Sequence, residues 1–520
     1  MRRRILAYLL SSVFCFAFTL SSFSQGTKAS KKAFRKGEEA IAKADYLRAY
    51  NLFAQVLKDE PQNMDAVYYS GLCLFGINKS DTAALKYFIA SKEKRPEAHF
   101  YIGQIYHLRG YTRNALEEFY YFKSVMNPEE FSQEEVNQWI RTCENEIKLE
   151  AQRENYIIKN LGEKVNTKYP EYVPLIWSVN GSLVFTSRRD NSKGGNIDPY
   201  GRFYEDIYLA KKNTEGWDNP LPFSDTINSA THDACVAFSP DGNELIIYRT
   251  DAKQTGGDFY ISRYDGTSWS TPVIMGPEIN SEFLEASACY SADGNEIIFS
   301  SNRPGGFGGK DLYKIVRFMN GKYSKPFNLG SEINTAEDED APFIDGKDNS
   351  LYFSSKGHNT IGEYDIFRSE YNTETNRWKA PLNLGLPINS TNDDIYFVKL
   401  SDDKSALFAS RRDGGFGDAD IYEIDLSANE PLVINCKINP GSIDISRVKN
   451  LQLSLYNIET GKLEGIYRPG KGRLNMVLVT IKDKAYKLIL EGSNIEPVVE
   501  TVSFNETKKE LTIDLKEKLK

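Results

Sequence analysis

A repeat of about fifty residues constrains this chain more than any other feature. An Asp followed by two apolar or aromatic residues occurs five times, at Asp206, Asp258, Asp311, Asp365 and Asp420, and the spacing grows by one from each copy to the next. Between these residues lie hairpin-turn signals, such as Asp241-Gly242, and apolar runs of strand length. Such a period is typical of propellers and solenoids. Each unit has the strand content of one four-stranded blade.

The two ends of the repeat predict how the ring closes. The fifth copy stops after Tyr422-Glu423-Ile424 without a fourth strand, and the stretch 157–162 parallels the fourth strand of an earlier copy at 381–385. We therefore predict that 157–162 completes the last blade of a five-bladed propeller over residues 156–427. Such closure leaves no free edge strand. The first copy is the loosest, because it carries an insertion from Asn191 to Glu205.

One acid per copy stands five residues after a marker Asn. These acids are Glu171, Asp233, Glu285, Glu339 and Asp394. They fall just before the innermost strand of each predicted blade, so they could form an acidic ring that binds a cation or a basic peptide at one mouth of the channel. The alternative is that each acid satisfies backbone donors or an Arg of its own blade. Arg189, Arg303 and Arg412 are natural partners, but Asp251 and Gly357 occupy that place in the other copies.

The first third of the chain contains a second, shorter repeat. Three glycines, Gly37, Gly71 and Gly103, are each followed twelve residues later by Ala49, Ala83 and Ala115, and then by the aromatic residues Phe53, Tyr87 and Phe119. Small residues let two helices approach closely, and the aromatic ring fills the gap to the next pair. The pattern resembles the tetratricopeptide repeat. It implies an all-α superhelix over residues 25–155 that offers a groove to a partner segment, with a purely structural spacer as the alternative.

The N-terminal residues predict export. Three arginines at positions 2–4 precede the apolar stretch 5–20, and Ser22-Phe23-Ser24 supplies small residues for cleavage. Residues 1–24 therefore predict a secretory signal peptide, with a membrane anchor as the alternative. No later run of eighteen apolar residues is present. We expect an exported, periplasmic chain with no transmembrane span after cleavage.

The last hundred residues change character again. After Asn429 the blade markers stop, and short alternating strands separated by turns such as Pro440-Gly441 and Thr460-Gly461 follow. This pattern predicts a small Ig-like β-sandwich over residues 428–520. It resembles the carboxypeptidase-regulatory type of sandwich. The predicted fold is thus a multidomain chain: helical repeats, an all-β propeller and a sandwich.

Motifs for chemistry are missing from the sequence. There is no G-x-S-x-G, H-E-x-x-H, P-loop or dinucleotide fingerprint, and the four histidines are dispersed. The cysteines have no metal or disulfide spacing, and we expect mostly buried thiols. A net charge of −8 argues against nucleic-acid binding. We predict no enzymatic activity, no cofactor and no metal site.

The domain order adds a family resemblance. The blade repeats resemble the PD40 (WD40-like, TolB-type) propeller, and the whole string resembles the PorE family of the type IX secretion system. The resemblance implies a non-catalytic periplasmic scaffold that binds envelope proteins, including an outer-membrane secretion complex, through the helical groove and the propeller face. The family's OmpA-like domain is not found before Lys520, so its cell-wall anchoring is not implied here.

Two alternatives to the scaffold stay open. Glycosidases with five-bladed propellers place two or three carboxylates at the axis, and the acidic ring could serve in that way. The uniformity of the ring argues against it, because a glycosidase needs unequal carboxylates in particular blades. A sugar-binding propeller belongs to the same alternative. The other alternative is a TolB-like protein of envelope integrity.

Overall fold

The computed structural model describes residues 27–517 apart from 80–81, 199–201, 215, 252–255, 430, 460, 470–473, 482–483 and 506–507. The predicted signal peptide lies outside the described residues. The chain divides into two compact units. The first holds the residues up to Arg153, Asn160–Lys399 and Leu407–Tyr422, and the second holds Glu154–Lys159, Leu400–Ala406 and Glu423–Lys520.

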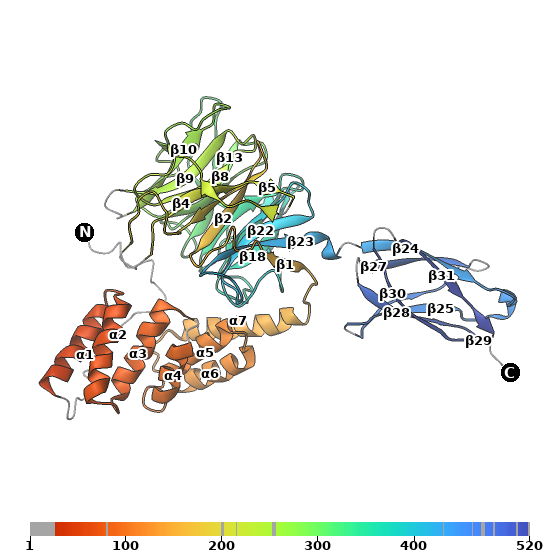
Figure 1. Ribbon diagram of the computed structural model, residues 1–520, viewed down its shortest axis with the longest axis horizontal. Helices are drawn as coiled ribbons and strands as arrows, with labels where there is room; N and C mark the ends of the chain where they lie inside the picture. The colour runs from red at the N-terminus through yellow and green to blue at the C-terminus, as the bar shows by residue number, and fades with distance from the viewer. Residues whose placement is uncertain are drawn as a thin grey trace. The chain divides into compact units, whose positions relative to one another are not determined.

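Seven helices open the described part of the chain (Figure 1). They are α1 (Lys28–Ile41), α2 (Tyr46–Asp59), α3 (Met64–Ile77), α4 (Thr82–Ser91), α5 (Ala98–Leu108), α6 (Thr112–Val125) and α7 (Gln133–Glu150). Side chains cap several N-termini: Thr27, Asp45, Asn63 and Ser132 each accept a backbone N–H three residues on. Each helix contacts the next one along the chain. A helical array therefore forms where the shorter repeat predicted one.

The predicted glycines lie where an aromatic ring presses on the helix backbone. A Cβ atom at Gly37 would lie 2.6 Å from the ring of Phe53, and one at Gly103 would lie 2.7 Å from the ring of Phe119. Both rings are fully buried. The close approach of helix and ring explains why these positions hold glycine.

The second helical pair differs from the predicted register by one residue. The ring that faces Gly71 is that of Phe88, and the buried small residue is Ala84. The prediction of Ala83 and Tyr87 was therefore wrong, because the interval from Gly71 to the buried alanine is one residue longer than in the other two units. The Tyr87 hydroxyl instead lies 3.3 Å from that of Tyr50.

Five antiparallel sheets follow in chain order. The first two contain β2 (Glu171–Trp177), β3 (Ser182–Ser187), β4 (Asp206–Ala210) and β7 (Leu221–Pro222), then β8 (Asp233–Phe238), β9 (Glu244–Thr250), β10 (Gly257–Arg263) and β11 (Val273–Ile274). The third contains β12 (Glu285–Tyr290), β13 (Glu296–Ser301), β14 (Asp311–Val316) and β15 (Phe327–Asn328). The fourth contains β16 (Glu339–Ile344), β17 (Ser350–Ser355), β18 (Asp365–Asn372), β19 (Arg377–Trp378) and β20 (Leu382–Asn383). The fifth contains β21 (Asp394–Lys399), β22 (Ser405–Ser410), β23 (Asp420–Asp425) and β1 (Ile157–Asn160), and a separate hairpin pairs β5 (Lys212–Asn213) with β6 (Gly216–Trp217).

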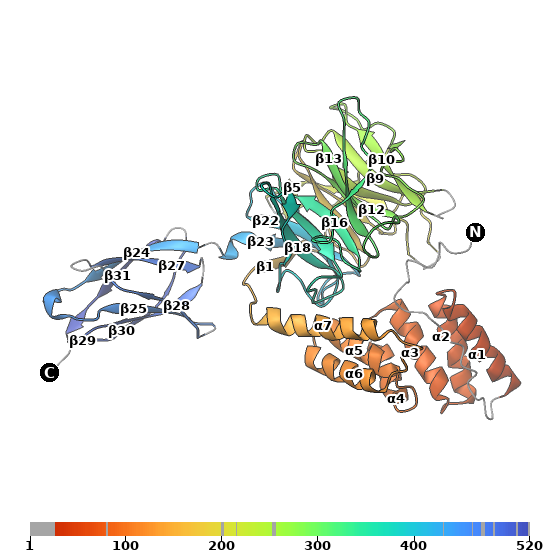
Figure 2. The same cartoon turned by 180° about the vertical axis from the view of Figure 1, so that it is seen from behind.

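The first strand of each sheet contacts the first strand of the next. The order of contact is β2, β8, β12, β16, β21 and back to β2, which gives a propeller-like arrangement (Figure 2). The N-terminal strand β1 is the outermost strand of the fifth sheet. Next to it, the backbone N–H of Leu161 donates to the carbonyl of Ile421 at 3.1 Å. The stretch 157–162 thus lies where the sequence predicted it.

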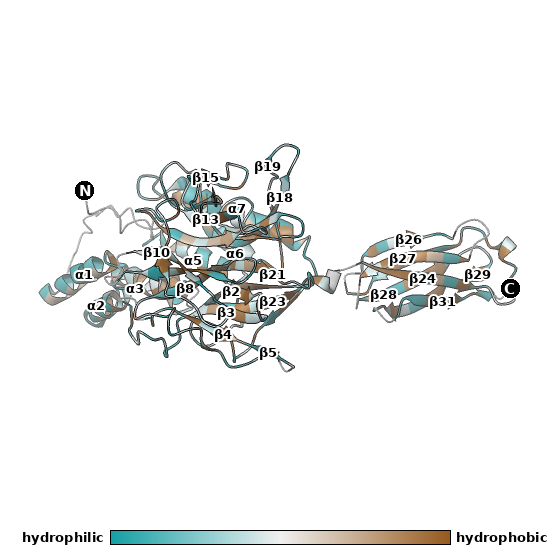
Figure 3. Cartoon of the chain, turned by 90° about the horizontal axis from the view of Figure 1, so that it is seen from above, coloured by the Kyte–Doolittle hydropathy of each residue, from teal (hydrophilic) through white to brown (hydrophobic). Residues whose placement is uncertain are grey.

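The middle strands form the core of each sheet. Every residue of β3 and of β17 is buried, and Phe185, Phe299 and Phe353 are among the largest fully buried side chains. Figure 3 shows that the hydrophobic segments lie mainly on strands, whereas many connecting loops are hydrophilic. Burial on both faces explains why these strands read as continuous apolar runs.

The second unit contains two sheets around a common apolar core. Its strands are β24 (Pro431–Asn439), β25 (Gln452–Asn457), β26 (Leu463–Tyr467), β27 (Asn475–Ile481), β28 (Ala485–Glu491), β29 (Ile495–Glu496), β30 (Val498–Ser503), β31 (Glu510–Asp514) and β32 (Lys516–Glu517). The sheet orders are β27-β24-β31 and β26-β25-β28-β30. Ile434, Leu455, Leu478 and Leu490 are fully buried between them. The pairing of β24 with β31 is parallel.

The described residues were also compared with the predictions for a membrane span and for the cysteines. None of their helices is long and apolar enough to cross a membrane. Their five cysteines, Cys73, Cys143, Cys235, Cys289 and Cys436, are all free and buried, which confirms the prediction of buried thiols. Burial raises the pKa of Cys73 and of Cys235 to about 12, so these thiols stay protonated.

Candidate functional site

The five predicted acids begin the inner strands β2, β8, β12, β16 and β21. All five, Glu171, Asp233, Glu285, Glu339 and Asp394, have no exposed surface. Each carboxylate accepts the backbone N–H of the residue four positions earlier, at 2.5 to 3.0 Å. None of them lines the central cavity described below. The predicted open acidic ring is therefore corrected: these side chains hold the loop of their own sheet.

Arginine pairs with the acid in four sheets. Three pairs are those that the sequence suggested: Arg189–Glu171 at 3.3 Å, Arg303–Glu285 at 3.0 Å and Arg412–Asp394 at 2.7 Å. In the second sheet Arg249 pairs with Asp233 at 2.6 Å. Arg249 stands two residues before Asp251, so the pairing there uses a different position of the repeat.

In the fourth sheet, the inner acid Glu339 is held by uncharged side chains and not by an arginine. Glu339 accepts hydrogen bonds at 2.7 Å from Thr335 and from the Ser355 hydroxyl. Burial raises the pKa of Glu339 to about 7, and the nearby charge of Asp311 adds to the effect. The Nε2 atom of His358 lies 2.9 Å from the carbonyl oxygen of Ile333. In the other sheets an Arg makes the equivalent contact.

Four of the repeat-defining aspartates, Asp206, Asp311, Asp365 and Asp420, accept backbone N–H groups from the loops that precede them. Asp311 accepts the backbone N–H groups of Phe307 and Gly308 at 2.7 and 3.2 Å. Asp420 accepts the equivalent groups in the fifth sheet at 2.6 and 3.1 Å, and Asp206 accepts the N–H of Lys193 at 2.5 Å. The Gly-rich stretch 304–309 is therefore a turn held by its own sheet.

The residues beside these repeated acids differ from sheet to sheet. Directly after the inner acid stand Tyr172, Ala234, Ala286, Asp340 and Ile395, and directly before the marker Asp stand Glu205, Gly257, Lys310, Tyr364 and Ala419. Three of these ten side chains are charged, and they are Glu205, Lys310 and Asp340. Sequence reasoning missed them because it followed what the copies share. The available signal was the departure of single copies from the repeat.

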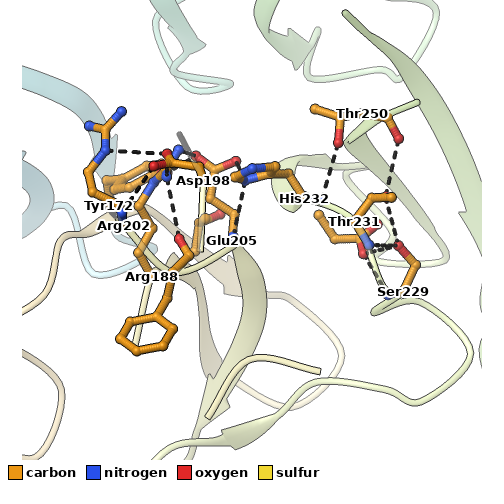
Figure 4. Close-up of polar contacts among 12 residues, drawn as sticks. Tyr172, Arg188, Asp198, Arg202, Glu205, Ser229, Thr231, His232 and Thr250 are labelled. Carbon is orange, nitrogen blue, oxygen red and sulfur yellow. Dashed lines mark hydrogen bonds and ion pairs between the residues drawn. The ribbon is translucent and has the colours of Figure 1, made fainter. Parts of the chain in front are cut away.

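Glu205 lies at the centre of one polar cluster (Figure 4). One of its oxygens is 2.7 Å from a guanidinium nitrogen of Arg188, and the other is 3.0 Å from Nδ1 of His232. The hydroxyl of Tyr172 donates a hydrogen bond to the same carboxylate. Burial alone would raise the pKa of Glu205, but the bonds with His232, Arg188 and Tyr172 lower it to about 2. Glu205 is therefore ionised at neutral pH.

The insertion in the first copy supports this cluster. Asp198 lies 3.0 Å from the second terminal nitrogen of Arg188 and 3.5 Å from Nε of Arg202. The backbone N–H of His232 donates to the hydroxyl of Thr250 at 3.2 Å. Asp198 of the insertion thus fixes Arg188, and Thr250 at the end of β9 fixes His232, around Glu205.

Asp340 forms a second cluster on the inner strand β16. Its carboxylate is hydrogen-bonded by the hydroxyl of Ser287 from β12 and paired with Lys310. Asp340 is only 3% exposed. Beside it, the hydroxyl of Tyr364 donates to Asp338 at 3.0 Å. The third and fourth sheets both contribute to this cluster.

Tyr396 connects the two clusters. Its ring stacks on that of Tyr172, with centroids 6.2 Å apart and planes 22° apart. Burial raises the pKa of Tyr396 well above its ordinary value, and the charges of Asp340 and Glu205 contribute. Tyr396 has φ +62°, and the inner strands of the other sheets carry irregularities, which redirect side chains.

A cavity of about 360 Å³ runs between the inner strands of all five sheets. Tyr396 and Ser287 belong to its lining, and so do the turn residues Pro240, Ala292 and Gly346. The lining includes no charged residue among those that the structure describes. In the same part of the chain, no group of three or more His, Cys, Asp or Glu side chains could hold a metal ion.

No protein-family model and no curated protein matches the chain. Solved structures are similar to it at low identity. A hypothetical protein from Leishmania major is 12% identical, with 54% of this chain and 93% of that chain covered and a TM-score of 0.36. The endo-arabinase from Bacteroides thetaiotaomicron is 15% identical, with 52% and 97% covered and a TM-score of 0.33. An α-L-arabinanase from Penicillium chrysogenum is 11% identical, with 52% and 99% covered and a TM-score of 0.33.

These comparisons contradict the function predicted from the sequence. The prediction was a non-catalytic scaffold without enzymatic activity, whereas the similar structures include an endo-arabinase and an arabinanase. The prediction of a non-catalytic scaffold is therefore corrected. Such distant similarity assigns no substrate to this chain. Its own side chains are the evidence for its function.

Proposed function

We propose that the five sheets are the blades of a five-bladed propeller that hydrolyses a glycosidic bond at Glu205 and Asp340. One observation carries the proposal: two carboxylates from different sheets, the buried Asp340 and the largely buried Glu205, each bind a hydroxyl group next to the central cavity, because Ser287 lines it and Tyr172 stacks on the lining residue Tyr396. They depart from the repeat, so the sheets themselves do not require them. A glycosidase needs carboxylates that occur in particular blades only. Glu205 and Asp340 meet this condition, whereas the inner acids, which recur in every sheet, do not.

The chemistry assigns a role to Glu205. Hydrolysis needs one carboxyl group to protonate the leaving oxygen and a second carboxylate to attack the anomeric carbon or to deprotonate water. With a pKa of about 2, Glu205 is ionised and suits the second role. Asp340 supplies the other carboxyl group, which has to take up a proton before it can protonate the leaving oxygen, because its carboxylate is paired with Lys310. The stacked rings of Tyr172 and Tyr396 give a flat, partly buried surface against which a sugar ring can lie.

The test is hydrolysis of a panel of oligosaccharides and dinitrophenyl glycosides. We expect Glu205→Gln and Asp340→Asn each to lower kcat by about 10²- to 10⁴-fold. A dinitrophenol leaving group needs no protonation, so it should restore turnover in Asp340→Asn and not in Glu205→Gln. Glu296→Gln is the matched control, because Glu296 pairs with Lys314 at 2.8 Å on a partly exposed part of β13. Full activity in either site variant, or no turnover of any substrate by the wild type, would refute the proposal.

The finer domain assignments belong to the same proposal. We propose that α1–α6 are three tetratricopeptide units, with contacts between successive helices and ring-filled glycines in support. We also propose that the second unit is an Ig-like sandwich, on the evidence of its two sheets and shared core. The domain boundaries, export, membership of the PorE family, and binding of envelope proteins by the helices stay predictions.

A further inference from the structure

The central cavity has the size of a small ligand site. Its volume of about 360 Å³ lies at the lower end of the range for ligand pockets, about 300–1,000 Å³. Small residues leave this space open: Ala286 and Ala288 lie on β12, and Ala341 follows Asp340 on β16. The cavity extends along the inner strands to the hairpin turns at Pro240 and Gly346.

The lining is apolar along most of this length. Val173, Val236, Phe343 and Val398 contribute aliphatic or aromatic surface. An apolar cavity of this kind binds apolar groups more readily than it holds water.

One end of the cavity differs from the rest. Ser287 lines the cavity and donates its hydroxyl to Asp340. Tyr396 also lines it and stacks on Tyr172, whose hydroxyl donates to Glu205. Two lining residues, Ser287 and Tyr396, therefore link this end of the cavity to the two carboxylate clusters through side-chain contacts. A ligand that fills it would meet hydrogen-bonding groups at one end and apolar side chains along the other.

We infer that this cavity is an apolar subsite that takes the alkyl or aryl group of an amphipathic ligand, with a hydroxyl-rich end at Glu205 and Asp340. The placement of the hydroxyl-rich end rests on the proposed function. Occupation of the cavity by the apolar group does not depend on turnover. The substrate class would then be a sugar linked to a short alkyl or aryl group, and not a long unbranched polysaccharide alone.

The test is calorimetric titration of the full chain with methyl, butyl and hexyl β-D-glucopyranoside. Burial of each added methylene group should raise the affinity about fourfold. Ala286→Trp should abolish this chain-length dependence by filling the cavity, whereas Ala286→Ser should keep it. Val398→Trp fills the cavity from another sheet, so the inference stays testable if the first variant does not fold, which circular dichroism would reveal.

The outcomes separate this inference from the proposed function. Glu205→Gln should keep the dependence of affinity on chain length even though it lowers kcat by about 10²- to 10⁴-fold. An affinity that does not change from methyl to hexyl in the wild type would overturn the inference. A dependence that survives in both folded Trp variants would overturn it as well. A protein that binds by chain length and never hydrolyses would keep the inference and refute the hydrolase.

Discussion

The inner acid Glu339 and the cluster carboxylate Asp340 are neighbours in the sequence, but the first bonds within its own sheet and the second bonds to another sheet. Glu339 is held by Thr335 and Ser355 of its own sheet, whereas Asp340 is bonded by Ser287 of β12 and by Lys310, which directly precedes β14. The first position carries an acid in every copy, and the second does so in one copy. An acid repeated in every sheet stabilises the sheet. An acid that breaks the repeat is free to serve a site.

Removal of an inner acid should have the largest effect on stability. Glu285 is fully buried, accepts hydrogen bonds from Ser281 and Ser301, and pairs at 3.0 Å with Arg303, whose side chain is largely buried. We expect Glu285→Ala to cost about 3–5 kcal/mol, because the largely buried guanidinium of Arg303 then keeps its carbonyl and hydroxyl partners but loses the opposite charge. Urea unfolding followed by tryptophan fluorescence measures this cost, since Trp177 and Trp269 lie among the sheets. A cost below about 1 kcal/mol would show that the inner acids are not structural.

The raised pKa of Glu339 predicts that the stability of the protein depends on pH. The pKa of Glu339 is raised from 4.5 to about 7 in the folded protein, so the fold favours the protonated form. Its contribution is therefore complete below pH 4.5 and is lost as the pH rises through 7. At about 1.4 kcal/mol for each pH unit in this window, the loss is on the order of 3 kcal/mol.

Glu339→Gln isolates this contribution, because glutamine stays neutral at every pH. The variant should gain stability relative to the wild type as the pH rises from 4.5 to 7.5, as measured by the midpoint of urea unfolding. Glu296→Gln, on the partly exposed part of β13, is the control. A constant difference between Glu339→Gln and the wild type over this range would show that Glu339 is ionised in the fold.

These predictions show which parts of the molecule the sequence could reveal. The periods of the two repeats, the strand 157–162 beside Ile421 and the pairs of Arg189, Arg303 and Arg412 follow from local spacing, so they could be predicted. The carboxylates of the site could not, because Glu205 meets His232 of the next copy and Asp340 meets Ser287 of the preceding one. Such contacts depend on how neighbouring sheets face each other. The partner Arg249 was missed because the second copy uses a different position of the repeat.

The helical repeat extends the comparison to residues without charge. A glycine recurs at the position of Gly103 in all three units, and a Cβ atom there would lie 2.7 Å from the ring of Phe119. We expect Gly103→Ala to cost about 1–3 kcal/mol through overpacking. Thermal unfolding followed by circular dichroism at 222 nm would measure this cost.

The control for this variant is the same substitution in a Phe119→Leu background. The smaller side chain relieves the close contact, so Gly103→Ala should cost less there than in the wild type, and the higher helix propensity of alanine can then favour the variant. An equal cost in both backgrounds would show that the ring does not constrain Gly103.

The smallest expected effect on stability is that of replacing Glu244 or Glu296. These two acids occupy the same position of the repeat in the second and third sheets. Glu244 forms ion pairs with Arg317 at 3.0 Å and with Arg263 at 3.1 Å, and it accepts a hydrogen bond from the hydroxyl of Tyr290 at 3.3 Å. Glu296 pairs with Lys314 at 2.8 Å, at a partly exposed site.

We expect Glu244→Ala to cost about 1–2 kcal/mol, because more than one hydrogen bond is lost. Glu296→Ala should cost less than about 1 kcal/mol, as exposed pairs do. Parallel urea titrations would compare the two variants. Equal costs would mean that the shared position of the repeat decides the contribution of the acid. A larger cost for Glu244 would mean that its neighbours in adjacent strands decide it, which is the same principle that separates Asp340 from Glu339.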